Sequence, residues 1–410
     1  MLYVCFCAAM GCGSSKIVPD SPVDPHVDWV KTLETGPNVR RNNNYNNTYH
    51  RNYNDHNSNK KKSMGKYKAK FDPRVLAKYD VKALIGRGSF SRVVRVEHKL
   101  TKQPYAIKMI EVKEGKEVFE TELGVLRRVR HTNIVQLVEV FETPERVYMV
   151  MELATGGELF DRIVARGSFT ERDATRAVQM VLEGVRYLHA LGITHRDLKP
   201  ENLLYYHPGN DSKILITDFG LASTRKAGDE MTMKTACGTP EYIAPEILLR
   251  KSYTNSVDLW ALGVITFILL SGTMPFDDEN RTRLYRKILR AKYSFSGEPW
   301  KDVSNLAKDF IVKLLTVNPN ERMGASVSMK HPWLVTNAAS SSLKNLQRSI
   351  SQNLLKRASS RSRSTKSARS TKSNKSNKSI VSLRSQHKRV QPEELDELAR
   401  SGTLFRDGDD

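Results

Sequence analysis

The sequence predicts an α+β protein in two lobes: a small antiparallel β lobe with one main helix, and a large, mostly helical lobe. Two observations support this fold class. Between residues 79 and 153, short segments rich in β-branched and aromatic residues alternate with turn-forming residues, which is typical of antiparallel strands. Beyond Gly156-Gly157, apolar residues recur every three or four positions, as they do on the buried face of a helix.

The expected elements follow this change of periodicity along the chain. The small lobe should contain a helix at 118–130 and strands at 79–85, 92–96, 105–110, 134–141 and 147–153. The large lobe should contain helices at 174–188, 257–270, 284–289 and 306–315. The folded core is expected to end near His331-Pro332-Trp333-Leu334, so that one domain spans residues 79–334.

Composition separates both ends of the chain from this domain. Residues 1–70 are expected to be disordered, because asparagine dominates residues 38–59 and few aliphatic side chains are present to drive folding. The 410-residue chain has a formal net charge of +21, and residues 340–390 carry fourteen Lys or Arg without an Asp or Glu. Residues 359–410 are a predicted disordered tail, rich in Ser, Arg and Lys, with an acidic end.

Cysteine use and hydropathy argue against two classes of protein. Cys5, Cys7 and Cys12 crowd the first dozen residues, and Cys237 stands alone. This spacing is not the disulfide framework of a secreted domain, and it favours a reducing, cytoplasmic compartment. No apolar run reaches the roughly 18 residues of a membrane-spanning helix, so a transmembrane protein is not expected.

One stretch of sequence predicts the reaction. It reads His195-Arg196-Asp197-Leu198-Lys199-Pro200-Glu201-Asn202, and Asp218-Phe219-Gly220 follows it. Phosphoryl transfer needs one carboxylate to accept the proton of the attacking hydroxyl, and an amide oxygen and a second carboxylate to hold Mg²⁺ against ATP. Asp197, Asn202 and Asp218 supply these groups in the pattern of a protein kinase, so the expected cofactors are ATP and Mg²⁺.

A glycine-rich turn and a lysine are expected to hold the nucleotide. Glycines let the backbone of the turn approach phosphates, although Ser91 replaces the usual third glycine. Lys108 offers an ammonium group to the α- and β-phosphates, and its expected partner is Glu122, preferred over Glu120 for its distance from His131. The nucleotide-binding residues predicted in this lobe are Ile85, Gly86, Arg87, Gly88, Ser89, Phe90, Ser91, Val93, Ala106, Lys108 and Glu122.

Further motifs carry a family resemblance. They are Gly156-Gly157-Glu158-Leu159-Phe160-Asp161, Gly238-Thr239-Pro240-Glu241-Tyr242, Ala244-Pro245-Glu246, Ser256-Val257-Asp258-Leu259-Trp260 and Glu321-Arg322. Through them, residues 79–334 resemble the calmodulin-dependent group of Ser/Thr protein kinases, and the chain from Met10 onward is similar to the protein serine kinase H family. The resemblance covers roughly three-fifths of the chain and implies a bilobal protein kinase fold.

The resemblance also implies roles around the catalytic loop. Lys199 would touch the transferring phosphate, and its place two residues after Asp197 implies specificity for serine and threonine. Thr239 would contact Asp197 and shape the acceptor pocket. Three residues are implied to be structural, with a buried ion pair between Glu246 and Arg322 and an anchor for the catalytic loop from Asp258.

Nucleotide and substrate contacts are implied in the same way. Met151 would be the gatekeeper beside an adenine hinge of Glu152, Leu153 and Ala154. Glu158, near the ribose, and Glu201, beside the catalytic loop, would receive an arginine two or three residues before the acceptor. The expected partners are therefore protein substrates with basic sites.

Regulatory phosphorylation is expected at two places. Arg196 usually pairs with an activation-loop phosphate in related kinases, and Thr235 or Thr232 could carry it. Asp229 and Glu230 could substitute in part, which leaves constitutive activity open.

A second predicted site, Ser351, has arginine three residues before it and leucine five residues before it, which is the substrate pattern inferred above. It could be an autophosphorylation site or an internal blocker. It lies in residues 340–358, where apolar residues at helical spacing alternate with basic ones. A calmodulin-binding helix, a membrane-surface helix and a docked extension of the core are equally compatible with this pattern.

The amino-terminal region carries a candidate lipidation signal. Met10-Gly11-Cys12-Gly13-Ser14-Ser15-Lys16 fits N-myristoylation of Gly11, and Cys12 could take palmitate. The signal works only if translation starts at Met10 rather than Met1. Because a single acyl chain binds membranes marginally, both lipids would be needed for anchoring at the Golgi, the endoplasmic reticulum or the plasma membrane.

Two alternatives from other functional classes stay open. A pseudokinase scaffold would bind partners without turnover, although its usual sign, a missing Lys, Asp or Asn, is not seen. The Ser/Arg/Lys-rich tail resembles splicing-factor tails and suggests an RNA-associated or speckle-associated adaptor in the nucleus, or a nuclear import signal. Its lack of aromatic residues to stack on bases argues against RNA binding.

Overall fold

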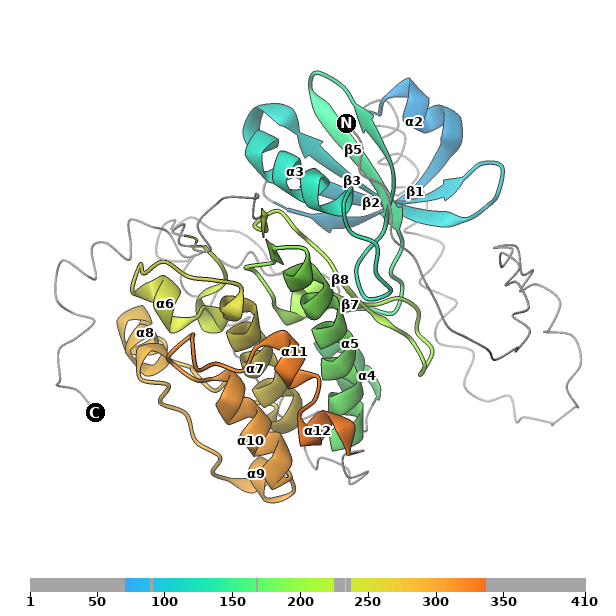
Figure 1. Cartoon of the computed structure of the whole chain (residues 1–410). Coiled ribbons are helices and arrows are strands. Elements are labelled where there is room, and N and C mark those ends of the chain that lie inside the picture. Colours follow the sequence, from blue (N-terminus) through green and yellow to red (C-terminus); the bar gives the residue numbers. More distant parts are fainter. Residues whose placement is uncertain (1–70, 89–90, 167–168, 225–232, 234–236, 337–410) are drawn as a thin grey trace, which may run out of the picture. The chain divides into compact units, whose positions relative to one another are not determined.

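The computed structural model describes residues 71–88, 91–166, 169–224, 233 and 237–336. Within them, the predicted two-lobed α+β fold is confirmed: an antiparallel sheet forms the small lobe, and the large lobe is mostly helical (Figure 1). The predicted disordered ends and the predicted helix at 340–358 lie outside the described residues.

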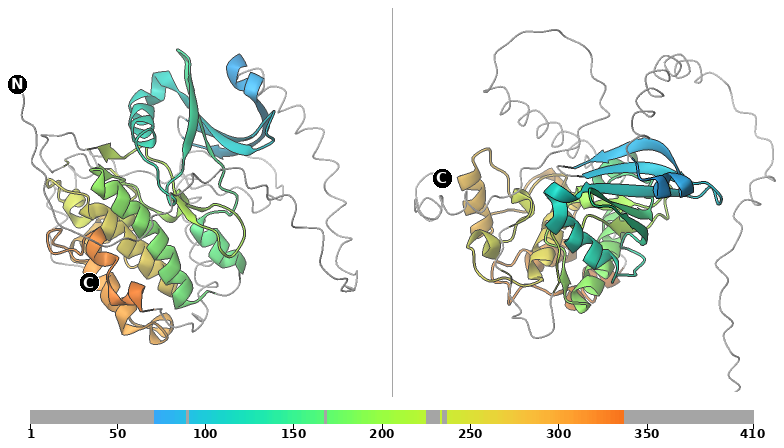
Figure 2. Two further views of the ribbon diagram at one scale, coloured as in Figure 1. Left: turned by 45° about the vertical axis from the view of Figure 1, so that its right-hand side comes forward. Right: turned by 90° about the horizontal axis from the view of Figure 1, so that it is seen from above.

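Five strands form the small lobe, in the order β1-β2-β3-β5-β4, with every neighbouring pair antiparallel. They are β1 (Tyr79–Arg87), β2 (Ser91–His98), β3 (Pro104–Glu111), β4 (Leu137–Glu142) and β5 (Arg146–Glu152). Residues 147–151 of β5 are all buried, because this apolar strand lies between β3 and β4 and is covered on both faces. Helix α3 (Val112–Leu126) packs against β3 and β5, and Figure 2 shows it in teal beside the sheet.

The bounds of α3 differ from the prediction. The helix begins at Val112, directly after β3, rather than at residue 118, and it ends at Leu126 rather than at residue 130. Gly115 has a non-helical backbone (φ −128°, ψ 18°) inside the first turns, and this kink separates the start of the helix from the predicted stretch at 118–130. The junction is fixed from outside the helix, since the Val112 N–H donates to the Glu145 carbonyl oxygen at 2.9 Å.

Two further features of the small lobe were not predicted. β4 begins at Leu137 rather than at residue 134, because Ile134 pairs only through an isolated bridge with Ile216 of the large lobe. Helix α2 (Pro73–Lys78) precedes the sheet, and its first turn is capped by the Asp72 carboxylate, which accepts from the Arg74 N–H at 2.8 Å. Val75 of α2 is fully buried against the outer core of the sheet.

The large lobe is built around α7 (Ser256–Ser271), which packs between α5 (Glu171–Ala190) and α10 (Asn305–Leu314). Residues 257–271 are all buried, because this helix is apolar on every side. The remaining helices are α4 (Leu159–Arg166), α6 (Pro245–Leu248), α8 (Arg281–Leu289), α9 (Glu298–Lys301), α11 (Ala325–Ser328) and α12 (Pro332–Val335). No helix among the described residues is both long and apolar enough to span a bilayer.

Short elements hold the loop at the junction of the lobes. Strand β6 (Ile193–Thr194) pairs with β9 (Ser223–Thr224), and β7 (Leu203–Tyr205) pairs with β8 (Ile214–Ile216). One-turn helices cover residues 200–202 and 240–242. The run from residue 195 to residue 202 is therefore fixed at both ends, which prepares it to carry functional side chains.

Candidate active site

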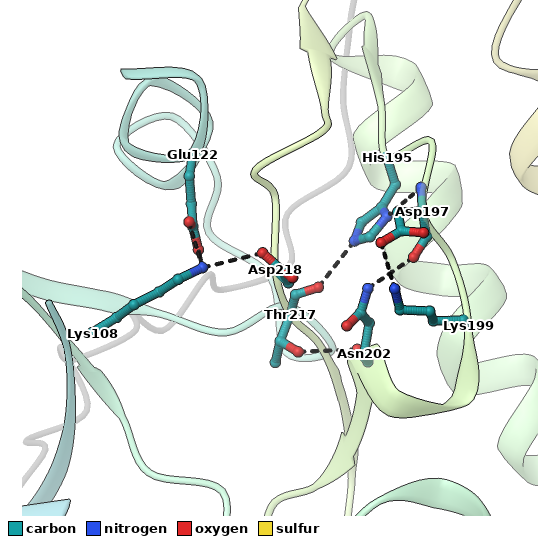
Figure 3. A network of polar contacts seen from close by, with 8 residues as sticks. All are labelled: Lys108, Glu122, His195, Asp197, Lys199, Asn202, Thr217 and Asp218. Carbon is teal, nitrogen blue, oxygen red and sulfur yellow. Dashed lines mark hydrogen bonds and ion pairs between the residues drawn. The ribbon is translucent and has the colours of Figure 1, made fainter. Parts of the chain in front are cut away.

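The carboxylate of Asp197 is buried and oriented by two side chains. Its Oδ1 atom accepts a hydrogen bond from Thr239 Oγ1 at 2.8 Å. Its Oδ2 atom accepts from Lys199 Nζ at 2.7 Å, a contact drawn in Figure 3. Lys199 also donates to Thr239 Oγ1 at 3.1 Å, which closes a triangle of contacts. The contact between Thr239 and Asp197 that the resemblance implied is present, and it fixes the direction of both carboxylate oxygens.

A carboxylate from the central helix supports the loop behind Asp197. Asp258 of α7 accepts from the His195 N–H and from the Arg196 N–H, both at 2.9 Å, and lies 2.8 Å from His189 Nε2. Arg196 has φ 67°, a strained conformation for a non-glycine residue that needs such support. Burial alone would raise the pKa of Asp258, but the hydrogen bonds from His189 and the Arg196 backbone outweigh it and lower the pKa.

Thr217, which the sequence analysis did not single out, joins the catalytic loop to Asp218. Its carbonyl oxygen accepts from His195 Nε2 at 3.0 Å, and its own N–H donates to the Asn202 carbonyl oxygen at 2.9 Å. The Asn202 side chain donates from Nδ2 to the Asp197 carbonyl oxygen at 2.8 Å (Figure 3). Because the amide nitrogen is used internally, the amide oxygen of Asn202 is the atom suited to a cation.

Lys108, Glu122 and Asp218 meet from three different elements. Lys108 Nζ lies 2.6 Å from Glu122 Oε2 and 3.1 Å from Asp218 Oδ1, so the ion pair predicted between β3 and α3 is present (Figure 3). Glu120, the competing candidate, is 56% exposed and lies 3.9 Å from Lys116 instead.

Burial and the neighbouring charges shift the pKa values of this triad differently: burial raises the pKa of Glu122 more than the Lys108 charge lowers it. Burial alone would lower the pKa of Lys108, but the carboxylates of Asp218 and Glu122 outweigh it and raise the pKa. The Lys108 charge in turn holds the pKa of Asp218 well below its usual range, so Asp218 is ionised at neutral pH. An ionised carboxylate and an amide oxygen, from Asp218 and Asn202, are the donor types that a hard cation such as Mg²⁺ prefers.

Gly220 allows α3 to approach Asp218. A Cβ atom on Gly220 would lie only 2.8 Å from Val118 Cγ1 of α3 and 3.5 Å from Asp218 Oδ1. A side chain at this position would crowd the Val118 side chain of α3, which would have to shift. The lack of space for a Cβ atom therefore explains why glycine suits the position after Phe219 in this structure.

The glycine-rich turn is described except at Ser89 and Phe90, which lie outside the described residues. The Gly88 N–H donates to the Ser91 carbonyl oxygen at 2.8 Å, and a Cβ atom on Gly88 would lie 2.6 Å from Ser91 Oγ. The serine that replaces the third glycine therefore packs against the second one. Ile85, Gly86 and Arg87 belong to β1, and Val93 belongs to β2.

Residues predicted to face adenine lie on neighbouring strands and on the segment that joins the lobes. Ala106 and Met151 are buried partners in the register of β3 and β5. Glu152 uses its carboxylate structurally, because Oε1 accepts from the Gln136 N–H at 2.8 Å and Oε2 lies 3.4 Å from Lys213 Nζ of the large lobe. Ala154 follows it in the connecting segment.

Acidic residues border the catalytic loop. Glu201 lies in its one-turn helix, and Glu158 forms a backbone bridge with Leu204 just beyond the loop. Asp161 of α4 lies close to the charge of Glu201. The pKa of Asp161 is raised, first by loss of hydration and then by the negative charge of Glu201. Asp161 belongs to one of the motifs that carry the family resemblance, but no role was predicted for it.

The phosphorylation candidates Thr232, Thr235 and Ser351 and the lipidation candidates Gly11 and Cys12 lie outside the described residues.

The structural pair implied by the resemblance is present in the large lobe. Arg322 donates to both carboxylate oxygens of Glu246, from Nη1 at 2.6 Å and from Nη2 at 2.9 Å.

Comparisons with known proteins agree with this geometry. A family model for the protein kinase domain matches residues 79–334. Serine/threonine-protein kinase H1 of Homo sapiens is 66% identical over 391 residues, which cover 87% of this chain and 91% of that protein. A serine/threonine-protein kinase H1 homolog of Pinctada fucata is 65% identical over 411 residues, with coverage of 97% and 99%. Calcium/calmodulin-dependent protein kinase type 1 of Macrobrachium nipponense is 48% identical over 303 residues, with coverage of 73% and 85%. The chain therefore belongs to the protein kinase family and is an ATP-binding serine/threonine protein kinase, similar to the H1 kinases and more distantly to a calmodulin-dependent kinase.

Proposed function

We propose that this kinase transfers the γ-phosphate of Mg²⁺-bound ATP to serine or threonine side chains that follow an arginine by two or three residues. The observation that carries the basic-site preference is the group of acids beside the catalytic loop, Glu158, Asp161 and Glu201. Loss of hydration raises the pKa of Asp161 first, and the negative charge of Glu201 raises it further, so these two acids lie close enough to repel each other. A guanidinium group would relieve this repulsion through charge-assisted hydrogen bonds.

Asp197 is the residue proposed to orient the attacking hydroxyl and accept its proton. Lys199 and Thr239 hold its two oxygens at 2.7 and 2.8 Å, which limits the carboxylate to one arrangement before substrate binds. Lys199 carries a positive charge at this position, where it would also stabilise negative charge on the transferring phosphoryl group.

Asn202 and Asp218 are the residues proposed to hold Mg²⁺, and Lys108 the residue proposed to bind the α- and β-phosphates. When bound, the metal ion would neutralise charge on the phosphate oxygens. The donor types suit it, because the Lys108 charge keeps Asp218 ionised and the Asn202 amide nitrogen is already bonded to the Asp197 carbonyl oxygen. The Asp218 side chain is 40% exposed, so it is accessible to a ligand from solvent.

The test of the substrate preference compares two peptides, one with arginine three residues before the serine and one with alanine there. Glu158→Gln and Glu201→Gln should each lower kcat/KM for the arginine peptide by about tenfold, and should leave the alanine peptide unchanged. Asp211→Asn is the matched control, because Asp211 is an acid 92% exposed in the turn between β7 and β8. Equal kcat/KM values of the wild-type kinase for both peptides would contradict the proposal.

Phosphorylation and calmodulin binding are proposed as controls on this activity. The support is in the sequence: Ser351 stands in the arginine-containing pattern, and residues 340–358 alternate basic and apolar residues at helical spacing. Phosphosite mapping after incubation with ATP should find Ser351, with Thr235 as the activation-loop site. Titration with calcium-loaded calmodulin should change the activity of the full chain but not that of a chain ending at residue 336.

Lipidation of Gly11 and Cys12 is proposed to hold the kinase at the cytoplasmic face of a membrane. The support is the seven-residue match that follows Met10. Intact-mass analysis of protein made in cells should find a myristoyl group on Gly11, and Gly11→Ala should move the protein from Golgi or plasma membranes into the cytosol. The pseudokinase and RNA-adaptor alternatives have no support from the comparisons.

A further inference from the structure

Tyr253, in the loop between α6 and α7, contacts three separate parts of the active site. Its side chain is 2% exposed. The phenol oxygen accepts from Arg196 Nη1 at 3.2 Å and lies 4.0 Å from Cys237 Sγ. Its backbone forms an antiparallel bridge with Met233, in which Tyr253 N–H donates at 2.9 Å and Met233 N–H donates at 2.7 Å.

The contact with Arg196 completes the coordination of its guanidinium group. Arg196 Nε donates to the Leu221 carbonyl oxygen at 2.6 Å, and Nη2 donates to the Ala222 carbonyl oxygen at 3.4 Å. These carbonyls follow Asp218-Phe219-Gly220, so Arg196 ties the catalytic loop to that segment. Among the described residues, two of these three acceptors of the guanidinium group are backbone carbonyls, and the Tyr253 hydroxyl is the side-chain acceptor that orients the guanidinium plane.

The contact with Cys237 reaches the other side of Asp197. Cys237 is followed by Gly238, whose φ of 123° turns the chain, and then by Thr239, which donates to Asp197. Arg196 directly precedes Asp197 in the sequence. One phenol oxygen therefore touches the neighbour of Asp197 on the catalytic loop and, through Cys237, the segment that brings Thr239 to Asp197.

The phenol is suited to this double contact because it stays neutral. Burial, and then the neighbouring Cys237, raise the pKa of Tyr253 above its ordinary value. A protonated hydroxyl can accept from Arg196 and can also donate toward the Cys237 sulfur. The contact should therefore persist throughout the pH range in which the kinase is assayed.

We propose that Tyr253 is a positioning residue for phosphoryl transfer, whose hydroxyl aligns Arg196 and the segment 237–239 so that Thr239 and Asp197 meet in the transition state. It does not touch the substrate, and it acts through those two partners. Its backbone bridge holds Met233 beside the same loop.

The test removes one oxygen atom. Tyr253→Phe should lower kcat by about tenfold, because a hydrogen bond to a charged group is lost, while KM for ATP stays within about twofold and the melting temperature within about 3 °C. Tyr293→Phe is the matched control: its ring contacts Phe267, Phe276 and Phe295 rather than the catalytic loop. This variant should keep the wild-type kcat.

A double-mutant cycle separates positioning from a general structural role. In an Arg196→Ala background, Tyr253→Phe should change kcat by less than about twofold, because the partner through which Tyr253 acts is already absent. Wild-type kcat in Tyr253→Phe would overturn the proposal. So would an equal tenfold loss in both backgrounds, or a loss that only follows a lower folded fraction in a thermal melt.

Discussion

Each lobe contains a buried ion pair, and the two pairs use the same charges for different purposes. In the large lobe, Arg322 meets Glu246, and the Arg322 side chain is 0% exposed. In the small lobe, Lys108 meets Glu122, and the Lys108 side chain is 12% exposed. The two pairs differ little in exposure to solvent. They differ more in how the other hydrogen-bond donors of Arg322 and Lys108 are used.

Arg322 has no donor left for a ligand. A guanidinium group has five N–H donors, and Arg322 makes five hydrogen bonds: two to Glu246 and three to the carbonyl oxygens of Thr316, Ser256 and Val317. Lys108 instead divides its ammonium group between Glu122 and Asp218, and Asp218 is 40% exposed. A buried ion pair is thus structural when every donor is used internally, and available for binding when one partner faces solvent.

Removing the lysine should have the largest effect on activity. Lys108→Met should lower kcat/KM by about 10²–10³-fold, because the positive charge proposed for the phosphates is lost. Glu122 is as buried as Glu246, but burial already raises its pKa and lets it take up a proton, so the melting temperature should fall by less than for the corresponding change in the large lobe. Lys116→Met, at an exposed lysine of α3, should keep wild-type activity. If circular dichroism showed that Lys108→Met does not fold, both ion pairs would be needed for stability. That result would contradict the distinction between a structural pair and a pair available for binding.

The same substitution in the large lobe should have the opposite signature. Arg322→Met leaves Glu246 buried without its partner, so the free energy of unfolding should fall by about 3–5 kcal/mol and the melting temperature by about 6–20 °C. The activity per folded molecule should stay near the wild-type value. Lys313→Met is the control, because its ion pair with Asp309 is exposed and should contribute under about 1 kcal/mol. A melting temperature unchanged in Arg322→Met would show that this pair is not structural.

A smaller effect sharpens the assignment of the lysine's partner. Glu122→Gln should lower kcat by about tenfold, because a neutral amide holds Lys108 less firmly. Glu120→Gln, two residues away on the exposed side of α3, should lower it by less than twofold. Steady-state kinetics of both variants measure the two losses of kcat. Equal losses would show that Glu122 is not the specific partner of Lys108.

The smallest effect concerns the acids that face solvent. Protonation of Asp161 removes negative charge that would attract arginine, and its raised pKa moves this loss to a higher pH than for an ordinary aspartate. The kcat/KM for the arginine peptide should therefore fall as pH is lowered toward that pKa. Asp161→Asn should be about twofold less active at neutral pH and should not have this part of the pH dependence. Identical pH profiles of kcat/KM for the wild type and Asp161→Asn would show that Asp161 does not help to attract the substrate arginine.

Strong local patterns made much of the fold predictable from the sequence. The five strands of the small lobe and the long helices α5, α7 and α10 were expected near their observed places, because their apolar periodicity is set locally. The two-residue strands β6 and β9 were not, because Ile193 pairs with Thr224 far along the chain. The start of α3 depends in the same way on a contact with Glu145.

The active site was predictable where sequence motifs carry its chemistry. The ion pair of Lys108 with Glu122 and the contact of Thr239 with Asp197 were both expected and are both present. Thr217 and Tyr253 were missed, because they act through a backbone carbonyl and a single hydroxyl that no motif marks. The contacts of Thr217 and Tyr253 can be recognised only in the three-dimensional structure.

The central claim is that the groups around Asp197 transfer phosphate to arginine-containing serine and threonine sites. Its most direct test follows the labelled γ-phosphate of Mg²⁺-ATP into a serine peptide with arginine three residues before the serine, using the wild type and Asp197→Asn. The wild type should label the serine, and the variant should be slower by about 10²–10⁴-fold with an unchanged melting temperature. Equal labelling by both proteins would contradict the account.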